Sequence, residues 1–525
     1  MSRKLLNLLS HLTVLGSFGQ PGAAAPSSST NQACEELSTT LADRVSYPLS
    51  LSYHSETTAY WSTILRELKP ACVVLPESAE EVSKAVTILN KYPDVKFTAK
   101  SGGHDPNAGH ATAQDGVLIS LEKMSGATYD SSTNLASVKP GGEWNDVISS
   151  LNEHGVTIVG GRLGIVGVGG YLVQGGISFL SAQYGLAADN IVGWEIVAAD
   201  GTIINVDANT QSELATALRG SGSQFGIVTK FTIKAHPIGK VWGGIRIYDA
   251  SQTDKIFKTL HDFVPGSNND TKAAIIVTNI SAVASLNAFL IFYFYDGENP
   301  PTEGPFADFL TIPSLVSITG TQTYPELAST MTMNAVFISN VFQLKSNGVG
   351  ASLINSRISF RTLTIPYVPE YPAMYSEISK KMTELSSDYF NNPLHLVSQC
   401  SVDFQPLPAA VGRQSEQNGG NAMGLTASDP DRVLLEFQCA WASKDDDDTL
   451  VSITRDLTAW IEARIPVWLE ASSEAKDVYL PLFMNDAMAD QNVTGSYRDY
   501  AKFKALQQEY DPIGTLRERT GGFKY

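Results

Sequence analysis

The sequence lacks the signatures of several common enzyme classes. It has no Gly-x-Ser-x-Gly elbow, no His-Glu-x-x-His or Cys-x-x-Cys pair and no P-loop. These absences argue against an α/β-hydrolase, a zinc hydrolase and a P-loop nucleotidase. The dinucleotide pattern Gly-x-Gly-x-x-Gly is also missing, and Gly220-Ser221-Gly222 approaches it with the wrong spacing, which weakens a Rossmann interpretation.

Positive charge is scarce as well. The 525 residues include 37 Lys and Arg against 54 Asp and Glu, for a formal net charge of −17. Nucleic acids and anionic membranes are bound through clustered basic residues, so we expect neither as a partner. The acidic run 445–448 is expected to be a solvated loop or a helix start rather than a metal site, and no metal is expected. The length predicts two to four domains.

The N-terminus has the pattern of a signal peptide. Arg3 and Lys4 precede a mostly apolar stretch at 5–18, and small residues follow at 22–25. This stretch is too short and too polar to span a membrane. We therefore expect residues 1–25 to be removed and the protein to be secreted or to reside in the secretory pathway.

Cysteine is rare but even in number, which agrees with export. We expect a local disulfide between Cys34 and Cys72, whereas Cys400 and Cys439 either pair or remain buried thiols. Three Asn-x-Ser/Thr sequons predict glycosylation in an exported chain, at Asn269, Asn279 and Asn492.

Glycine is abundant in two places. The first is the turn Ser101-Gly102-Gly103-His104, directly after a predicted strand at 95–99, and the second runs over 160–170 and 175–176. Glycine lets backbone amides converge without a side chain between them, and such a nest neutralises a pyrophosphate without lysines. Two nests from separate segments are suited to hold one dinucleotide. An imidazole such as that of His104 is also a nucleophile toward an electrophilic cofactor carbon.

The surrounding pattern alternates strands and helices up to about residue 238. A capping box at 78–81 begins a helix, and Trp144 begins an apolar helical stripe. Strands are expected at 116–121, 135–139 and 226–234, with a hairpin turn at Asp200-Gly201. Beyond 237, strands mix with longer helices, and the polar loop 414–424 is expected at the rim of a pocket.

These motifs resemble those of FAD-linked oxidases with a p-cresol-methylhydroxylase-type FAD domain, in the berberine-bridge-enzyme-like group of fungal secreted type. The resemblance rests on the two glycine segments, on 184–190 and on 225–229. It implies an α+β fold with a two-subdomain FAD-binding domain, a substrate domain with an antiparallel sheet and flanking helices, and a returning C-terminal segment. The implied boundaries are a signal peptide at 1–25, an FAD-binding domain at 26–236, a substrate domain at 237–474 and a C-terminal segment at 475–525.

The resemblance also implies the cofactor contacts. His104 is expected to carry FAD covalently through the 8α-methyl carbon. Further FAD contacts are expected from Lys100, Ser101, Gly102, Gly103, Val166, Gly167, Gly169, Gly170, Gly176, Ile177, Asn190, Val192 and Ile227.

Three residues of the second segment bear on the chemistry. Leu163 stands where bicovalent relatives have a cysteine, so a single covalent bond is expected. Val166 occupies the position thought to control access of oxygen, and its small size suits an oxidase. Tyr171 stands where many relatives have a histidine. Tyr171, Tyr479 and Asn485 are the predicted catalytic residues, and Gln405 and Glu436 are further candidates for the base.

The resulting prediction is an oxidase with two substrates, a small molecule and molecular oxygen. The small molecule is expected to be an alcohol, an amine or a secondary metabolite, and its hydride passes to FAD and then to oxygen. Two alternatives stay open: a carbohydrate oxidase, and an FAD-containing cyclase of a biosynthetic pathway without net redox change.

Overall fold

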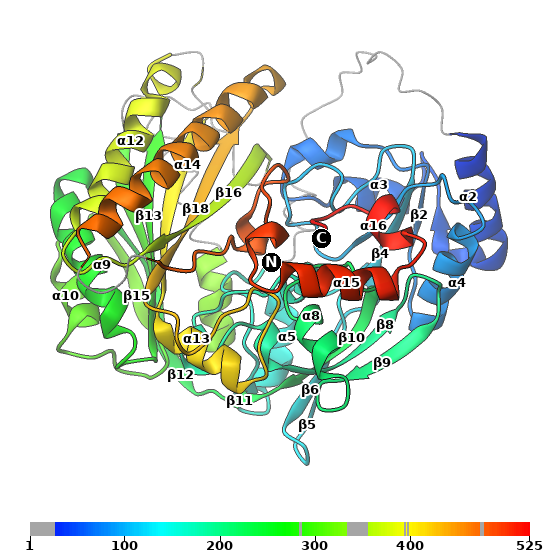
Figure 1. The fold of residues 1–525 in the computed structure, drawn as a ribbon, viewed down its shortest axis with the longest axis horizontal. Coiled ribbons are helices and arrows are strands. Elements are labelled where there is room, and N and C mark those ends of the chain that lie inside the picture. The colour runs from blue at the N-terminus through cyan, green and yellow to red at the C-terminus, as the bar shows by residue number, and fades with distance from the viewer. Residues whose placement is uncertain (1–26, 283–285, 333–354, 393–394, 396–397, 473–476) are drawn as a thin grey trace.

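The computed structural model describes residues 27–282, 286–332, 355–392, 395, 398–472 and 477–525, so the predicted signal peptide lies outside the described residues. The fold is α+β, as predicted, with two larger sheets and a two-stranded sheet in the N-terminal part of the chain and one seven-stranded sheet after residue 239 (Figure 1). Within the described ranges, no helix is both long enough and apolar enough to cross a membrane.

The first sheet is mixed. Its order is β1 (Val45–Ser46), β2 (Cys72–Val74), β4 (Val117–Ser120), β3 (Phe97–Lys100), with β2, β4 and β3 parallel. The helices of this region are α2 (Ser28–Thr40), α3 (Leu51–Thr58) and α4 (Ala79–Leu89). The side chain of Ser78 accepts a hydrogen bond from Glu81 N (3.3 Å), as the capping box predicts.

The second sheet is antiparallel. Its order is β5 (Ala127–Asp130), β6 (Leu135–Val138), β10 (Ile227–Lys234), β8 (Ile191–Val197), β9 (Ile203–Asp207). Gly201 has φ +90° in the turn between β8 and β9, which confirms the hairpin. The remaining elements are α5 (Trp144–Asn152), α6 (Val168–Val173), α7 (Ser181–Tyr184), α8 (Ser212–Leu218) and the pair β7 (Val156–Thr157) and β11 (His236–Pro237).

The third sheet has seven antiparallel strands. Its order is β15 (Val316–Thr323), β12 (Lys240–Asp249), β14 (Leu286–Tyr295), β13 (Ala273–Ala282), β17 (Gln399–Leu407), β18 (Arg432–Trp441), β16 (Arg357–Pro366). One face is covered by α9 (Thr253–Gly266), α10 (Pro305–Thr311), α12 (Ala373–Phe390) and α14 (Asp447–Glu470) (Figure 1). The acidic run 445–448 covers the end of the 3-10 helix Lys444–Asp446 and the first two residues of α14, which agrees with the predicted helix start.

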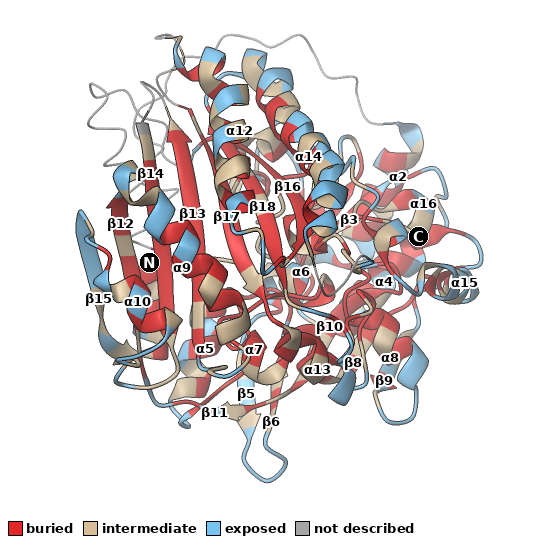
Figure 2. Ribbon diagram, turned by 60° about the vertical axis from the view of Figure 1, so that its left-hand side comes forward, coloured by how far each residue is buried: buried red, intermediate tan, exposed pale blue. Residues whose placement is uncertain are grey.

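The two faces of this sheet receive different residues, because side chains alternate along each strand. Cys400, Val402 and Phe404 of β17 belong to the core under the helices. Asp403 and Gln405 alternate with them and therefore point to the other face. The central strands are buried along most of their length (Figure 2), so the polar residues of this second face lie inside the molecule.

The C-terminal segment returns to the N-terminal part of the chain. It contains α15 (Tyr500–Tyr510) and α16 (Thr515–Arg519). Arg519 donates hydrogen bonds to Leu89 O (2.8 Å) and Val95 O (3.0 Å), and Phe523 packs edge-on against His110. Short 3-10 helices occur at Ala42–Arg44, Thr63–Glu67, Leu121–Lys123, Ala188–Asn190, Ala250–Gln252, Lys444–Asp446, Met484–Asp486 and Thr494–Ser496.

The loop 414–424 corrects one expectation. Its first residues continue α13 (Ala409–Gln417), and Arg219 donates a hydrogen bond to Gly420 O (3.2 Å). The segment is thus packed against the second sheet region and does not form a rim of the main cavity, because its glycines end a helix and meet a buried arginine.

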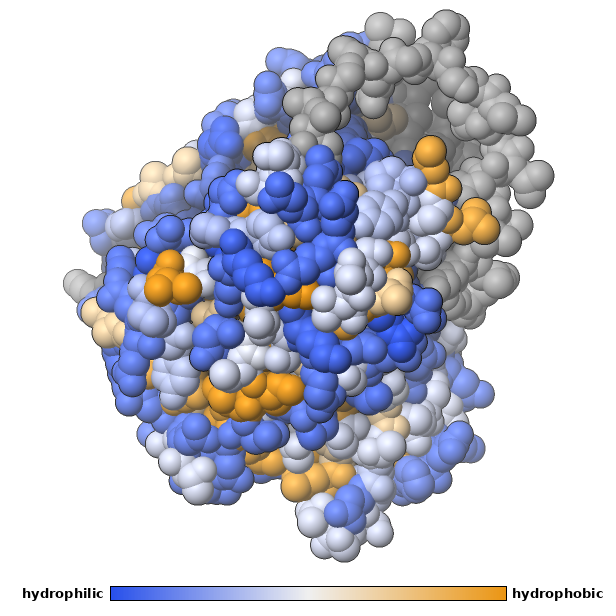
Figure 3. Space-filling model, turned by 90° about the vertical axis from the view of Figure 1, so that its right-hand side faces the viewer, coloured by the Kyte–Doolittle hydropathy of each residue, from blue (hydrophilic) through white to orange (hydrophobic). Residues whose placement is uncertain are grey.

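Both cysteine pairs form disulfides, Cys34–Cys72 as predicted and Cys400–Cys439 between β17 and β18. Asn269 and Asn492 are exposed, whereas Asn279 is buried in β13 and accepts a hydrogen bond from Ser379 Oγ (2.6 Å). The glycan at Asn279 stays a prediction, and the burial of this side chain argues against a sugar on it in the folded chain. The face shown in Figure 3 is mostly hydrophilic, with apolar side chains in separate small groups.

Candidate functional site

The main cavity lies between the N-terminal sheets and the seven-stranded sheet. It has a volume of about 280 Å³. Both glycine segments contribute to its wall, and so do β18, residues 483–486 and the C-terminal residues 520–523. Segments far apart in the sequence therefore meet at one internal surface.

The two glycine segments touch each other through their main chains. A Cβ atom on Gly102 would lie 2.5 Å from Gly167 Cα, which is closer than real atoms approach. Ser101 Oγ joins the segments further, because it donates to Pro140 O (2.6 Å) and accepts from Gly169 N (3.1 Å). Gly103 has φ +64°, a conformation that favours glycine. We call these two segments, 101–104 and 161–170, the glycine wall.

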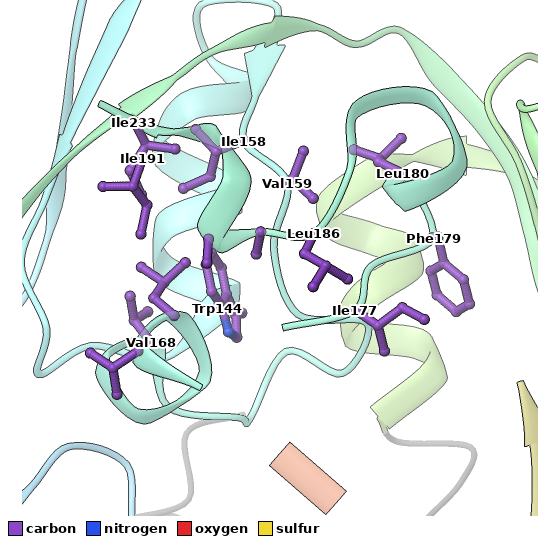
Figure 4. Close-up of a cluster of buried hydrophobic side chains, with 14 of the residues drawn as sticks. Trp144, Ile158, Val159, Val168, Ile177, Phe179, Leu180, Leu186, Ile191 and Ile233 are labelled. Carbon is purple, nitrogen blue, oxygen red and sulfur yellow. The ribbon is translucent and has the colours of Figure 1, made fainter. Parts of the chain in front are cut away.

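The Trp144 ring packs against the main chain of the glycine wall from behind. Its ring is fully buried, and Cβ atoms on Gly160 and Gly161 would lie 2.5 and 2.3 Å from it. Figure 4 shows Trp144 within a cluster of apolar side chains from several elements, among them Ile158 and Val168. The glycines here are thus required both by the cavity and by the tryptophan behind them.

Lys100 anchors the first glycine turn from behind. Its ammonium is 3.1 Å from Glu56 Oε2 and donates to Glu56 O (2.6 Å), and both side chains are almost fully buried. Burial opposes ionisation of Glu56, but Lys100 outweighs it and lowers the pKa of Glu56 to about 2. Lys100 therefore holds the strand end and is not among the residues that line the cavity.

His104 lines the cavity and stacks on an aromatic side chain. Its ring is parallel to that of Trp61, with centroids 4.2 Å apart and 7° between the planes. Phe360 of β16 contacts Trp61 from the seven-stranded sheet, with ring centroids 4.9 Å apart. The imidazole is therefore fixed in orientation where the two parts of the molecule meet.

The structure brings Tyr171 and Asn485 together and leaves Tyr479 elsewhere. The Tyr171 hydroxyl lies 2.6 Å from Ile177 O, and burial raises its pKa far above the ordinary value. Asn485 accepts from Gly176 N (3.0 Å) and donates to Tyr171 O (3.2 Å). Tyr479 donates to Met423 O (2.6 Å), beneath the guanidinium of Arg498, away from the residues lining the cavity.

Carboxylates gather on the opposite side of the cavity. Glu436 of β18 and Asp486 line it, and Asp403 of β17 lies directly opposite Glu436 in the strand register. We call Asp403, Glu436 and Asp486 the acidic group. Arg162, from the glycine wall, donates to Gln405 Oε1, and Gln405 Nε2 donates to Asp486 Oδ2 (3.2 Å).

Burial raises the pKa values of all three carboxyls in the acidic group. Asp403 and Asp486 are only 9% and 7% exposed. Burial raises the pKa of Asp403 to about 7 and that of Asp486 to about 6. Burial, together with the neighbouring charges of Asp486 and Asp403, raises the pKa of Glu436 well above its ordinary value. The three groups therefore differ in protonation near neutral pH.

Most of the predicted cofactor residues line this cavity and a few do not. Ser101, Gly102, Gly103, His104, Val166, Gly167, Gly169, Gly170, Ile177 and Ile227 line it. Besides Lys100, the exceptions are Gly176, Asn190 and Val192. The Asn190 side chain donates hydrogen bonds to Tyr184 O and Leu186 O, and its Oδ1 lies 2.9 Å from His236 Nε2. These contacts join it to neighbouring segments of the protein.

Sequence reasoning missed Asp403, Asp486 and the C-terminal residues Thr520–Phe523. Asp403 lies in an ordinary alternating strand, and Asp486 lies in the short 3-10 helix Met484–Asp486 between α14 and α15. Asp486 directly follows the predicted Asn485 and is an acidic residue in a largely apolar run. This is one signal in the sequence that could have identified it.

The residues present fit an FAD cofactor. The glycines of the glycine wall bring main chain without side chains to the cavity, as a pyrophosphate requires. The wall near Ile227, Val228 and Phe231 is apolar and suits a flat ring system. Within the described part of the chain, no cluster of three His, Cys, Asp or Glu side chains is arranged to hold a metal.

Comparisons with known proteins agree with this fit. A family model described as an FAD binding domain matches residues 70–207. An uncharacterized FAD-linked oxidoreductase of Arthroderma benhamiae is 32% identical over 91% of this chain and 92% of its own length. FAD-dependent monooxygenase drtC of Aspergillus calidoustus is 29% identical over 98% and 94%. The structure of xylooligosaccharide oxidase from Myceliophthora thermophila shares the fold, with TM-score 0.70, 19% identity and coverage of 94% and 99%.

Proposed function

The chain belongs to the FAD-linked oxidoreductases of the berberine-bridge-enzyme-like family, and from this premise we propose that it is a secreted oxidase of a small alcohol, amine or secondary metabolite. One observation carries the proposal: the glycine wall, His104 and the carboxylates of Glu436 and Asp486 line one internal cavity. A cofactor held on the glycine wall then has proton-accepting groups on the other side of the substrate.

The proposed overall reaction balances as follows. The substrate loses a hydride from carbon and a proton from its O–H or N–H group, and a C=O or C=N double bond forms. FAD supplies the hydride acceptor when bound, and molecular oxygen takes up the two electrons with two protons to give hydrogen peroxide. The chain's own carboxylates receive the substrate proton and release it to solvent.

The glycine wall is proposed to hold the pyrophosphate and ribityl groups. Main-chain N–H groups of 101–104 and 167–170 neutralise phosphate charge without a lysine, since Lys100 is committed to Glu56. Gly176, Asn190 and Val192 are proposed to support the wall from outside the cavity. Ile177 and Ile227 are proposed to contact the ring systems.

His104 is proposed to form the single covalent bond to the 8α-methyl carbon. Stacking on Trp61 fixes the imidazole plane, and Leu163 lines the same cavity without a thiol. Covalent attachment suits an exported enzyme, because lost cofactor is not replaced outside the cell. Export itself is proposed from the pattern at 1–25, and two disulfides and exposed sequons at Asn269 and Asn492 support it.

Two measurements test the proposal. Wild-type protein precipitated with acid should retain its yellow colour, and His104→Ala should release its flavin into the supernatant. Release of all flavin from the wild type would refute the covalent bond. Candidate alcohols and amines should bleach the flavin without oxygen and yield one peroxide per product in air. Product formation without bleaching would instead support the cyclase alternative.

A further inference from the structure

The acidic group contains two carboxyls that face the same cavity in different surroundings. Asp486 comes from the C-terminal segment, and Glu436 comes from β18 of the seven-stranded sheet. A shared carboxyl site works best when the two pKa values are pushed apart, because one group then donates a proton or hydrogen bond while the other accepts. The contacts around each group decide which role it takes.

Asp486 is held by a chain of hydrogen bonds that favours its ionised form. Gln405 Nε2 donates to Asp486 Oδ2 (3.2 Å), and Gln405 Oε1 in turn accepts from Arg162 Nη1. Arg162 thus orients the Gln405 amide so that the amide N–H points at the Asp486 carboxylate. The positive charge of Arg162 also favours the ionised form of Asp486. A donor and a nearby cation both stabilise a carboxylate.

Glu436 has the opposite surroundings. Asp403 lies directly across from it in the β17–β18 register, on the same face of the sheet. Asp403 is itself engaged by Thr278 Oγ1, which donates to its Oδ1. Burial raises the pKa of Glu436, and the neighbouring carboxyls of Asp486 and Asp403 raise it further, so the Glu436 carboxyl is kept protonated.

We propose that Asp486 is the catalytic base and that protonated Glu436 is a hydrogen-bond donor to the substrate, with Gln405 and Arg162 as positioning residues for Asp486. This inference rests on the proposed function. The substrate O–H or N–H bond breaks, its proton goes to an Asp486 carboxylate oxygen, and the C–H hydride leaves to the cofactor. Glu436 keeps its proton and points it at the same substrate heteroatom.

The charged and titratable groups facing Asp486 come from four elements. They are Arg162 of the glycine wall, Tyr171 of α6, Asp403 of β17 and Glu436 of β18. Of these groups, only Arg162 favours the ionisation of Asp486. The base is therefore active above about pH 6, the value to which burial raises the pKa of Asp486, and it is lost as the pH falls through that value.

The test needs no knowledge of the substrate. The midpoint potential of the bound flavin is measured from pH 5 to 9 in the holoprotein, in Asp486→Asn, in Glu436→Gln and in the control Asp477→Asn, an exposed carboxylate of the same segment. Two electrons added to the flavin raise the pKa of a nearby carboxylate, so reduction takes up an extra proton where that carboxylate is otherwise ionised. In the wild type, the midpoint potential of the bound flavin should therefore fall more steeply with increasing pH above about pH 6.

The variants separate the two roles. Asp486→Asn should remove the steepening, whereas Glu436→Gln and Asp477→Asn should keep it. Gln405→Leu should move its onset to higher pH, because the carboxylate loses its donor, and Asp486→Glu should restore the steep region. If Glu436→Gln removes the steepening and Asp486→Asn keeps it, the roles are reversed and the inference fails. A flavin-loaded wild type without any steepening also overturns it, whereas a wild type without flavin refutes the proposed function instead.

Discussion

The two sides of the cavity are made of different parts of the polypeptide. The glycine wall presents main chain at van der Waals contact, and Gly102 and Gly167 leave no room for even one extra carbon. The acidic group presents side chains from β17, β18 and the C-terminal segment, and Gln405 of β17 donates a hydrogen bond to Asp486. The two sides should therefore respond to different substitutions. Added bulk should disrupt the glycine wall, whereas isosteric changes that remove charge should disrupt the acidic group.

This difference also separates binding from chemistry. Main-chain amides carry no titratable proton, so the glycine wall binds its ligand in the same way over a wide range of pH. Carboxyls with raised pKa values change charge between about pH 6 and 7. Cofactor content is thus expected to be insensitive to pH in the range where the redox behaviour changes.

The largest effect is expected from adding one methyl group to the glycine wall. Gly102→Ala places a Cβ 2.5 Å from Gly167 Cα, and the neighbouring main chain cannot move aside. We expect loss of nearly all bound flavin, measured by the absorbance ratio at 450 and 280 nm, because the main-chain amides of the nest no longer converge on the phosphates. Gly239→Ala is the matched control, since nothing lies within 4 Å of its Cβ position and it is not among the residues lining the cavity, and it should keep its flavin.

The anchor behind the glycine wall should give the next largest effect. Lys100→Met leaves the buried Glu56 carboxylate without its cation, with the hydrogen bond from Ser120 Oγ (2.6 Å) still in place, and should cost about 3–5 kcal/mol in the free energy of unfolding. Because the folded pKa of Glu56 is about 2 instead of 4.5, its contribution is complete above pH 4.5 and is lost as the pH falls toward 2. The difference between wild type and variant should therefore shrink in that window.

A double variant controls this prediction. Lys100→Met with Glu56→Gln removes both charges and should recover much of the stability lost in the single variant. Urea unfolding at pH 7 of all three proteins measures it. Equal stability of Lys100→Met and wild type would show that the pair does not hold the turn.

The disulfide behind the acidic group should matter for stability more than for cofactor binding. Cys400 and Cys439 lie on the helix-covered face of β17 and β18, and their bond closes a loop over a sequence separation of 39. The loop-closure relation gives about 4 kcal/mol. Cys400→Ser with Cys439→Ser should lower the Tm while the ratio of flavin to protein stays unchanged. A loss of flavin with unchanged Tm would contradict this separation.

The smallest effects are expected at the glycosylation sites, away from both sides of the cavity. Asn269→Gln and Asn492→Gln should each remove a glycan mass from the exported protein and change stability by less than about 0.5 kcal/mol, because both side chains are exposed. Asn279→Gln should leave the mass spectrum of intact protein unaltered apart from the substitution itself. A glycan lost from Asn279→Gln would mean that this strand is open when the sugar is added.

The glycine wall could be predicted from the sequence because each of its turns depends on residues that are adjacent in the chain. A run such as 101–104 after a strand signals converging amides by itself, and His104 stands out within it. The capping box at Ser78 and the hairpin at Gly201 were predictable for the same reason. Of the acidic group, only Glu436 was a candidate from the sequence, since Asp403 and Asp486 are ordinary residues until the β17–β18 register and the returning C-terminal segment place them near it.

The same limit explains the predictions that did not lead into the cavity. Tyr479 had the right chemistry for a base, but its hydroxyl is bonded to Met423 O at another surface. The loop 414–424 had the composition of a mobile rim, but its carbonyl at Gly420 is bound by Arg219. In each case the deciding contact is more than fifty residues away in the chain.

A crystal structure of the purified yellow protein tests the central claim most directly. The account predicts electron density for FAD along the glycine wall, continuous with the His104 imidazole, with the isoalloxazine ring between Tyr171 and the carboxyls of Glu436 and Asp486. Flavin bound elsewhere, or an empty cavity in protein that carries one flavin per chain, would contradict it.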